Sequence, residues 1–344
     1  MDRAINILIT GAGGAAAVSV YKALNGAGIT CFMADIDPYA SGLYLVPPER
    51  RILLPRGDHK AFVPTLLHAC QSNGIDVLIP TVEVEFLPIS KYRNLFEFDG
   101  TQLMLAAQET LDACLDKWIL LQTAKTIVPT PETALLDQTF DASKWVLPVI
   151  AKPRKGSGSN GIYLIQTWQQ LDTVPKDGSY IVQAYLPGPE FSIDVFATAK
   201  GKVMAAVPRE RLKVDSGIAV AARVRKDPIL EKWAKKLAEH LKLNYCANIQ
   251  FRLDEAGTPK LLEMNARFPG TLPLTVAAGV NMPALCLKSL YGETIHPDQC
   301  TYEEIAVMRY LQEAIIPIGE LEALEKEKAY MTHPDRYKAA LSSA

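Results

Sequence analysis

The segment LLEMNARF carries three polar side chains at alternate positions, Glu263, Asn265 and Arg267. Alternate residues of an extended strand point to the same side, so these three share a face between apolar neighbours. The upstream segment NIQFRLD adds Gln250, which strand pairing could bring beside Glu263 and Asn265. One carboxylate and two carboxamide oxygens suit Mg²⁺, and Arg267 could neutralise a transferring phosphoryl group. The pattern predicts a metal and phosphate site, although a solvated outer strand face would carry similar residues.

A lysine and a glycine-rich loop follow one another in VIAKPRKGSGSNGIYLI. Lys152 ends an apolar strand, and the loop interleaves glycines with hydroxyl and amide side chains: Gly156, Ser157, Gly158, Ser159, Asn160 and Gly161. An ammonium group beside a loop rich in N–H and hydroxyl donors suits closure over a polyphosphate. The spacing differs from that of a Walker loop. A β-hairpin with a surface lysine is the alternative interpretation.

The segment QAYLPGPEFSIDV joins the end of one strand, through a turn, to a second strand. Backbone groups at a strand end can bind an adenine base, and a nearby carboxylate can accept hydrogen bonds from ribose hydroxyls. Glu190 and Asp194 are the carboxylates of this segment. A solvated acidic residue in a turn is the competing interpretation.

The beginning of the chain, NILITGAGGAAAVSVYKAL, has a strand–glycine–helix pattern with Gly11, Gly13 and Gly14 in its turn. Together with Asp35 at the end of the next strand, it nearly fits the dinucleotide fingerprint. The turn could bind NAD or FAD, bind an anionic substrate group, or be purely structural. Because the residues suited to ATP follow more than a hundred positions later, we expect these glycines to hold a substrate anion such as a carboxylate.

The elements that must position these residues change character along the chain. The first hundred residues alternate short apolar strands with helical patterns, which predicts a parallel sheet with crossover helices. An amphipathic helix, DACLDKWILLQTAKTI, follows. After it come short strands separated by turn residues, which favour antiparallel pairing, and helices over 228–241 and 272–290. The sequence therefore predicts an α/β domain followed by an α+β region.

Composition excludes several classes of protein. Lys and Arg number 36 against 38 Asp and Glu, so no overall field attracts nucleic acid or an anionic membrane. The six cysteines are widely spaced without a zinc pattern, which is typical of reduced thiols. No signal peptide or apolar run of about 20 residues is evident, and we expect a cytoplasmic protein.

In this order the motifs resemble those of the ATP-grasp superfamily, most closely its branch similar to the carbamoyl-phosphate synthase large subunit and to PylC. The resemblance covers about residues 5–315, and its most specific part is the E-x-N-x-R motif at 263–267 with Gln250 upstream. It implies a Rossmann-like pre-ATP-grasp domain at 1–108. It also implies a two-lobed ATP-grasp fold, with the glycine loop in a lobe at 109–184 and the metal and catalytic residues in a lobe at 185–344.

The resemblance also implies roles for individual residues. The nucleotide would be held by Lys117, Lys152, the loop Gly156–Gly161, Gln183, Ala184, Tyr185, Leu186 and Glu190. One or two Mg²⁺ ions, or Mn²⁺, would be held by Gln250, Glu263 and Asn265. Arg267, Lys152 and Arg211 would act in catalysis. The basic segment with Arg209 and Arg211 would face the acyl phosphate or the acceptor, or it would form a charged edge strand.

The implied activity is that of an ATP- and Mg²⁺-dependent carboxylate–amine ligase. A small amino-acid-like substrate would pass through an acyl phosphate and form an amide or peptide bond. Small-molecule carboxylates and amines would be the partners, without nucleic acid or membrane, and relatives suggest a homodimer. The alternatives are a bicarbonate-using carboxylase or carbamoyl-phosphate-type enzyme, a non-catalytic nucleotide-binding module, and an NAD-dependent oxidoreductase.

Overall fold

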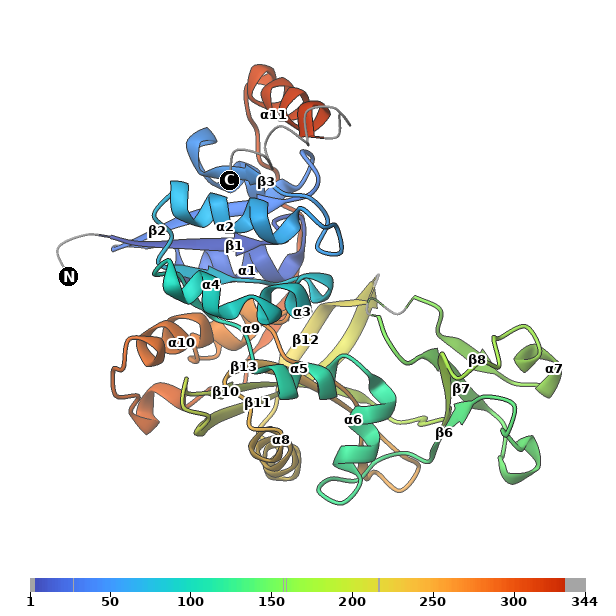
Figure 1. Ribbon diagram of the computed structural model, residues 1–344. Coiled ribbons are helices and arrows are strands. Elements are labelled where there is room, and N and C mark those ends of the chain that lie inside the picture. The colour runs from blue at the N-terminus through green and yellow to red at the C-terminus, as the bar shows by residue number, and fades with distance from the viewer. Residues whose placement is uncertain (1–3, 27, 157, 159, 216, 332–344) are drawn as a thin grey trace. The chain divides into compact units, whose positions relative to one another are not determined.

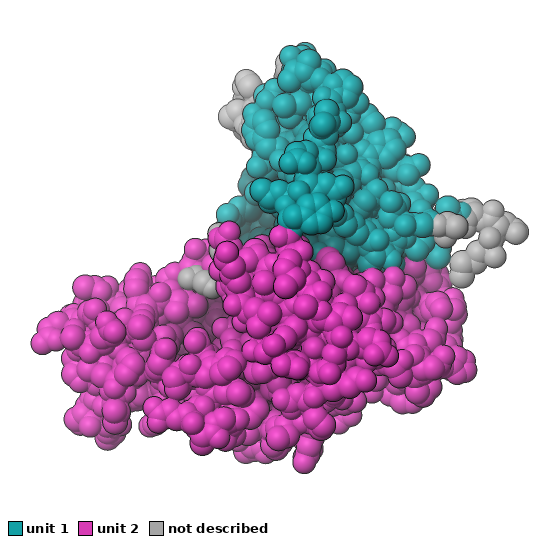
Figure 2. All heavy atoms as spheres, turned by 180° about the vertical axis from the view of Figure 1, so that it is seen from behind, with its two compact units in different colours: residues 1–105, 310–344 teal, residues 106–309 magenta. Residues whose placement is uncertain are grey.

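The computed structural model describes residues 4–26, 28–156, 158, 160–215 and 217–331. The chain divides into two compact units, which Figure 2 distinguishes by colour. Unit 1 comprises Met1–Leu105 and Tyr310–Ala344, and unit 2 comprises Ala106–Arg309. Among the described helices, none combines the length and the apolar character that crossing a bilayer requires.

Unit 1 is built on a five-stranded parallel sheet with the strand order β3-β2-β1-β4-β5. Its strands are β1 (Ile5–Thr10), β2 (Ile29–Asp35), β3 (Arg51–Leu53), β4 (Val77–Ile79) and β5 (Gln102–Leu103). The connecting helices are α1 (Ala15–Leu24), α2 (Phe62–Ser72), α3 (Glu83–Lys91) and α4 (Arg93–Phe98), and Figure 1 shows them on both faces of the sheet. Consecutive residues Ile7, Leu8 and Ile9 are therefore fully buried, as a covered parallel strand requires. This sheet confirms the α/β prediction.

The last described helix, α11 (Ile318–Met331), belongs to unit 1. Its Glu320 pairs with Arg51 of β3 at 2.7 Å, and Glu325 accepts a hydrogen bond from Tyr39 Oη at 2.7 Å. The sequence division had included this helix in the lobe ending at 344, because local patterns do not reveal where a late acidic helix finds its basic partner. The expected boundaries at 108 and 184 stay predictions.

Unit 2 contains two antiparallel sheets, which confirm the predicted α+β region. The four-stranded sheet has the order β6-β9-β7-β8, with β6 (Thr133–Leu136), β9 (Tyr180–Ala184), β7 (Val149–Pro153) and β8 (Tyr163–Ile165). The six-stranded sheet has the order β14-β13-β10-β11-β12-β15. Its strands are β14 (Pro259–Asn265), β13 (Tyr245–Leu253), β10 (Glu190–Ala197), β11 (Val203–Asp215), β12 (Ile218–Val224) and β15 (Ala306–Met308).

Two segments expected to be single helices are each broken in unit 2. The first divides into α5 (Gln108–Cys114) and α6 (Lys117–Ala124), because the Asp116 carboxylate caps α6 by accepting from the N–H groups of Trp118 and Ile119. The second divides into α9 (Leu272–Ala277) and α10 (Met282–Leu290). Between them Gly279 takes a φ of +120°, a conformation that ends a helix. A short helix, α7 (Trp168–Leu171), follows β8.

The six-stranded sheet has one apolar face, which packs on helix α8 (Pro228–His240). Asp227 caps α8, and its buried residues recur at the helical spacing Leu230, Ala234, Leu237 and Ala238. They meet every second residue of β10: Phe191, Ile193, Val195 and Ala197. The intervening residues of β10 must then point to the opposite face, where the candidate site lies.

Candidate nucleotide and metal site

Strand pairing brings the predicted metal ligands together on the polar face of the six-stranded sheet. The register sets Gln250 opposite Glu263 and Asn248 opposite Asn265, while Ser192 of β10 lies opposite Gln250. These five residues line a pocket of about 570 Å³ within unit 2. The predicted pairing of the two strands is thus confirmed.

The donor set fits a hard cation that takes further ligands from a substrate. Asn265 Nδ2 donates to Glu263 Oε1 at 3.1 Å, which leaves the amide oxygen of Asn265 as the atom available to a cation. The described chain contains no cluster of three or more His, Cys, Asp or Glu residues suited to a metal. One carboxylate with two amides matches Mg²⁺, which keeps waters and binds substrate phosphates.

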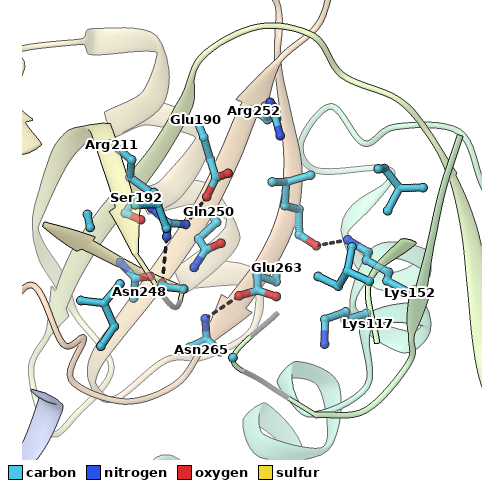
Figure 3. A pocket seen from close by; sticks show the side chains of 18 of the residues that line it. Lys117, Lys152, Glu190, Ser192, Arg211, Asn248, Gln250, Arg252, Glu263 and Asn265 are labelled. Atoms are coloured by element: carbon cyan, nitrogen blue, oxygen red, sulfur yellow. Dashed lines mark hydrogen bonds and ion pairs between the residues drawn. The ribbon is translucent and has the colours of Figure 1, made fainter. Parts of the chain in front are cut away.

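Two buried lysines also line the pocket, one on α6 and one on the four-stranded sheet, as Figure 3 shows. Lys152 on β7 donates to the carbonyl oxygen of Leu262 at 3.5 Å. Burial lowers the pKa of Lys152 to about 8, and the nearby Glu263 carboxylate opposes this shift. Lys117, the first residue of α6, donates to the carbonyl oxygen of Gly156 at 2.7 Å. Both ammonium groups therefore lie where phosphate oxygens could replace backbone carbonyls.

The glycine loop forms part of the pocket wall. Gly156 and Gly158 line the pocket with φ values of +107° and +74°. Gly161 also has a positive φ, but it is not among the lining residues, and a Cβ there would lie 3.0 Å from Tyr180 Oη. Glycine at this position thus allows the Tyr180 side chain to pack closely against the backbone. The predicted Ser157 and Ser159 lie outside the described residues.

The segment predicted to meet the adenine also lines the pocket. It comprises Gln183, Ala184, Tyr185 and Leu186, where β9 ends. The guanidinium of Arg252 lies 5.9 Å from the centre of the Tyr185 ring. Glu190, at the beginning of β10, lines the pocket as well and forms an ion pair with Arg211.

Two family models match the chain. The first, described as an ATP-grasp in the biosynthetic pathway with Ter operon, matches residues 176–314. The second, described as the PylC-like N-terminal domain, matches residues 7–104. The first match places residues 176–314 in the ATP-grasp superfamily. The resemblance inferred from the motif order is confirmed, and the second match agrees with the PylC-like branch.

The relatives that the chain matches are distant. A D-alanine–D-alanine ligase of Thermotoga petrophila is 29% identical over 136 residues, 38% of this chain and 45% of the relative. The chain thus spans less than half the length of that curated relative. A biotin carboxylase structure from Campylobacter jejuni has a TM-score of 0.70 at 17% identity, covering 86% and 73% of the two chains. An L-amino acid ligase structure from Bacillus licheniformis has a TM-score of 0.63 at 17% sequence identity, covering 84% of this chain and 75% of that one. Both structures share the fold.

One predicted substrate residue lies outside the pocket. Arg209 is fully buried and binds the Asp194 carboxylate through Nε at 2.9 Å and Nη2 at 2.6 Å. Asp194 also accepts from Asn248 Nδ2 at 2.8 Å and from Thr275 Oγ1 of α9 at 2.5 Å. Neither member of the pair lines the pocket. The assignment of Arg209 to substrate binding is therefore corrected, as is the suggestion that Asp194 accepts ribose hydroxyls.

The first glycine turn has internal partners in unit 1. Gly13 N–H donates to Asp35 Oδ2 at 2.7 Å, and Gly14 N–H donates to the carbonyl oxygen of Gly11 at 2.8 Å. A substrate anion at this helix start would compete with the Asp35 carboxylate. Binding of substrate by these three glycines stays a prediction.

Several lining residues escaped the sequence analysis, although alternation could have found some of them. Asn248 and Arg252 flank Gln250 at two-residue spacing, and Ser192 follows Glu190 at the same spacing. Each therefore shares the face of a residue that was predicted. Thr271 lies in the segment between β14 and α9 and offers no such periodic signal.

The hydrogen-bonded Asp194 carboxylate should contribute strongly to stability. Asp194→Asn should lower the free energy of unfolding by about 3–5 kcal/mol, because it leaves the buried Arg209 charge uncompensated. The double variant Asp194→Leu with Arg209→Met should recover much of this loss. Urea denaturation measures both, with Asp172→Asn, an exposed partner of Lys176, as the nearly neutral control. Equal stability of Asp194→Asn and wild type would contradict the assigned network.

Proposed function

We propose that this chain is an ATP- and Mg²⁺-dependent ligase that joins a carboxylate to an amine through an acyl phosphate. The observation that carries the proposal is the convergence of the two lysines on a face with one carboxylate, two amides and Arg267. Similarity to a D-alanine–D-alanine ligase supports carbon–nitrogen bond formation. Likeness to biotin carboxylase concerns the fold and does not favour bicarbonate as the substrate.

The charge of the pocket supports a polyphosphate ligand. Among its described lining residues, the carboxylates are Glu190 and Glu263. The cations are Lys117, Lys152, Arg211, Arg252 and Arg267. Cations outnumber carboxylates by three, five against two, and such a concave surface attracts a phosphate chain.

In the proposed reaction, an oxygen of the substrate carboxylate attacks the γ-phosphorus of ATP in line, and ADP leaves. Lys117 and Lys152 bind phosphate oxygens, and Arg267 stabilises the transferred phosphoryl group. Gln250, Glu263 and Asn265 would hold the cation, which neutralises phosphate charge. The neutral amine then attacks the acyl carbon, phosphate leaves, and the amine nitrogen loses its proton. The chain supplies position and charge rather than a covalent nucleophile.

The proposal extends to the substrates and their setting. The carboxylate and amine are small and amino-acid-like, and Gly11, Gly13 and Gly14 are proposed to hold an anionic part of one of them. Nucleic acid and membrane are not partners in this proposal. We also propose that the enzyme is cytoplasmic and forms a homodimer.

The proposed cation ligand gives the first test of function. Glu263→Ala should reduce Mg²⁺-dependent ADP release about a hundredfold or more, because charge stabilisation at the phosphates is lost. Glu255→Ala, in an exposed turn between β13 and β14, is the matched control and should keep full activity. Unchanged ADP release by a folded Glu263→Ala protein would remove Glu263 from the metal site.

The low pKa of Lys152 gives a pH prediction for nucleotide binding. The ammonium form is present below about pH 8 and is lost above it. Affinity for ADP, measured by calorimetry without turnover, should therefore fall between about pH 7 and 9. Lys152→Arg should flatten the profile, because a guanidinium stays protonated throughout this range. An equally steep fall in the variant would show that another group is responsible.

A further inference from the structure

Glu190, the proposed ribose ligand, already has a cationic partner. Arg211 Nη1 forms an ion pair with Glu190 Oε1, and Arg211 Nη2 donates to the carbonyl oxygen of Gly217 at 2.8 Å. The two side chains are 10% and 23% exposed, so the pair is largely sheltered from water. Figure 3 shows Arg211 beside Glu190 and away from Lys152 and Glu263. Arg211 therefore binds Glu190 through one terminal nitrogen and the β11–β12 turn through the other.

A bound ribonucleotide would compete for this carboxylate. Both the ribose hydroxyls and the Arg211 guanidinium donate hydrogen bonds, and a pair of ribose hydroxyls bound to both Glu190 oxygens would take the Oε1 atom that Arg211 contacts. Displacing Arg211 would not leave Glu190 without a nearby cation, because Arg252 lies directly opposite it on β13. Arg211 would then have donors available inside a pocket that contains a transferring phosphoryl group.

We propose that Arg211 is held by Glu190 until the ribose of the nucleotide displaces it. This inference rests on the proposed function, since it takes Glu190 as the ribose ligand and gives the displaced Arg211 to the acyl phosphate. The ion pair thereby lowers nucleotide affinity. Once the nucleotide is bound, the Arg211 guanidinium is available to the acyl phosphate. Nucleotide and anionic substrate then bind with positive coupling, and the coupling is reciprocal.

The test uses the full chain and measures binding apart from turnover. Arg211→Met should bind ADP about twofold to fivefold more tightly than wild type, because a partly exposed ion pair no longer opposes the ribose. The variant should still lose ligation. Its affinity for 2′,3′-dideoxy-ADP should not change, because that nucleotide cannot displace Arg211. Arg211→Gln should give the same direction if Met disturbs folding.

The matched control is Arg223→Met on β12. Arg223 pairs with Glu210 at 2.6 Å on the same strand pair but does not line the pocket, so its loss should leave ADP affinity unchanged. Equal or weaker ADP binding by folded Arg211→Met and Arg211→Gln would overturn the proposal. An equal gain for ADP and dideoxy-ADP would overturn it too. Tighter ADP binding by these variants, in a chain that forms no amide, would uphold Arg211 displacement and contradict the ligase instead.

Discussion

Alternation along β10 divides the six-stranded sheet into an apolar face and a charged face. Phe191, Ile193 and Val195 pack into the core with α8, and this fixes Glu190 and Asp194 on the opposite side. The antiparallel register passes the same division to the neighbouring strands. A shift of one residue would bury charged groups and expose the core, so the hydrophobic packing specifies the register on which the site depends.

The charged groups in and beside the pocket differ in how completely they are paired. Deep under α9, the Asp194 carboxylate is fully paired and closed to ligands. Across the pocket from this face, Lys152 of β7 and Lys117 of α6 are buried yet bonded to backbone carbonyls that a phosphate could replace. Burial makes each unpaired charge costly, and these internal partners offset that cost for the two ammonium groups. In the proposed function, the phosphates of the nucleotide replace those backbone carbonyls as partners of the lysines.

Much of this site could be predicted because alternation and strand pairing are local rules. They placed Gln250 beside Glu263 and located the parallel and antiparallel regions. They could not separate Arg209 from Arg211, which share one face of β11 at two-residue spacing. The difference between them comes from α9, whose Thr275 closes over the Asp194 pair from a distant part of the chain. The helix breaks at Asp116 and Gly279, and the attachment of α11 to unit 1, likewise depend on caps and partners that periodicity does not encode.

The central claim is that the pocket phosphorylates a carboxylate. The direct measurement is incubation of the full chain with ATP, Mg²⁺, a mixture of amino acids labelled with ¹⁸O in their carboxyl groups, and small amines, followed by mass spectrometry of the released phosphate. An acyl phosphate keeps the bridging carboxylate oxygen on phosphorus when the amine attacks the acyl carbon. Each phosphate released with an amide product should therefore carry one ¹⁸O. ATP consumption that yields only unlabelled phosphate would contradict it.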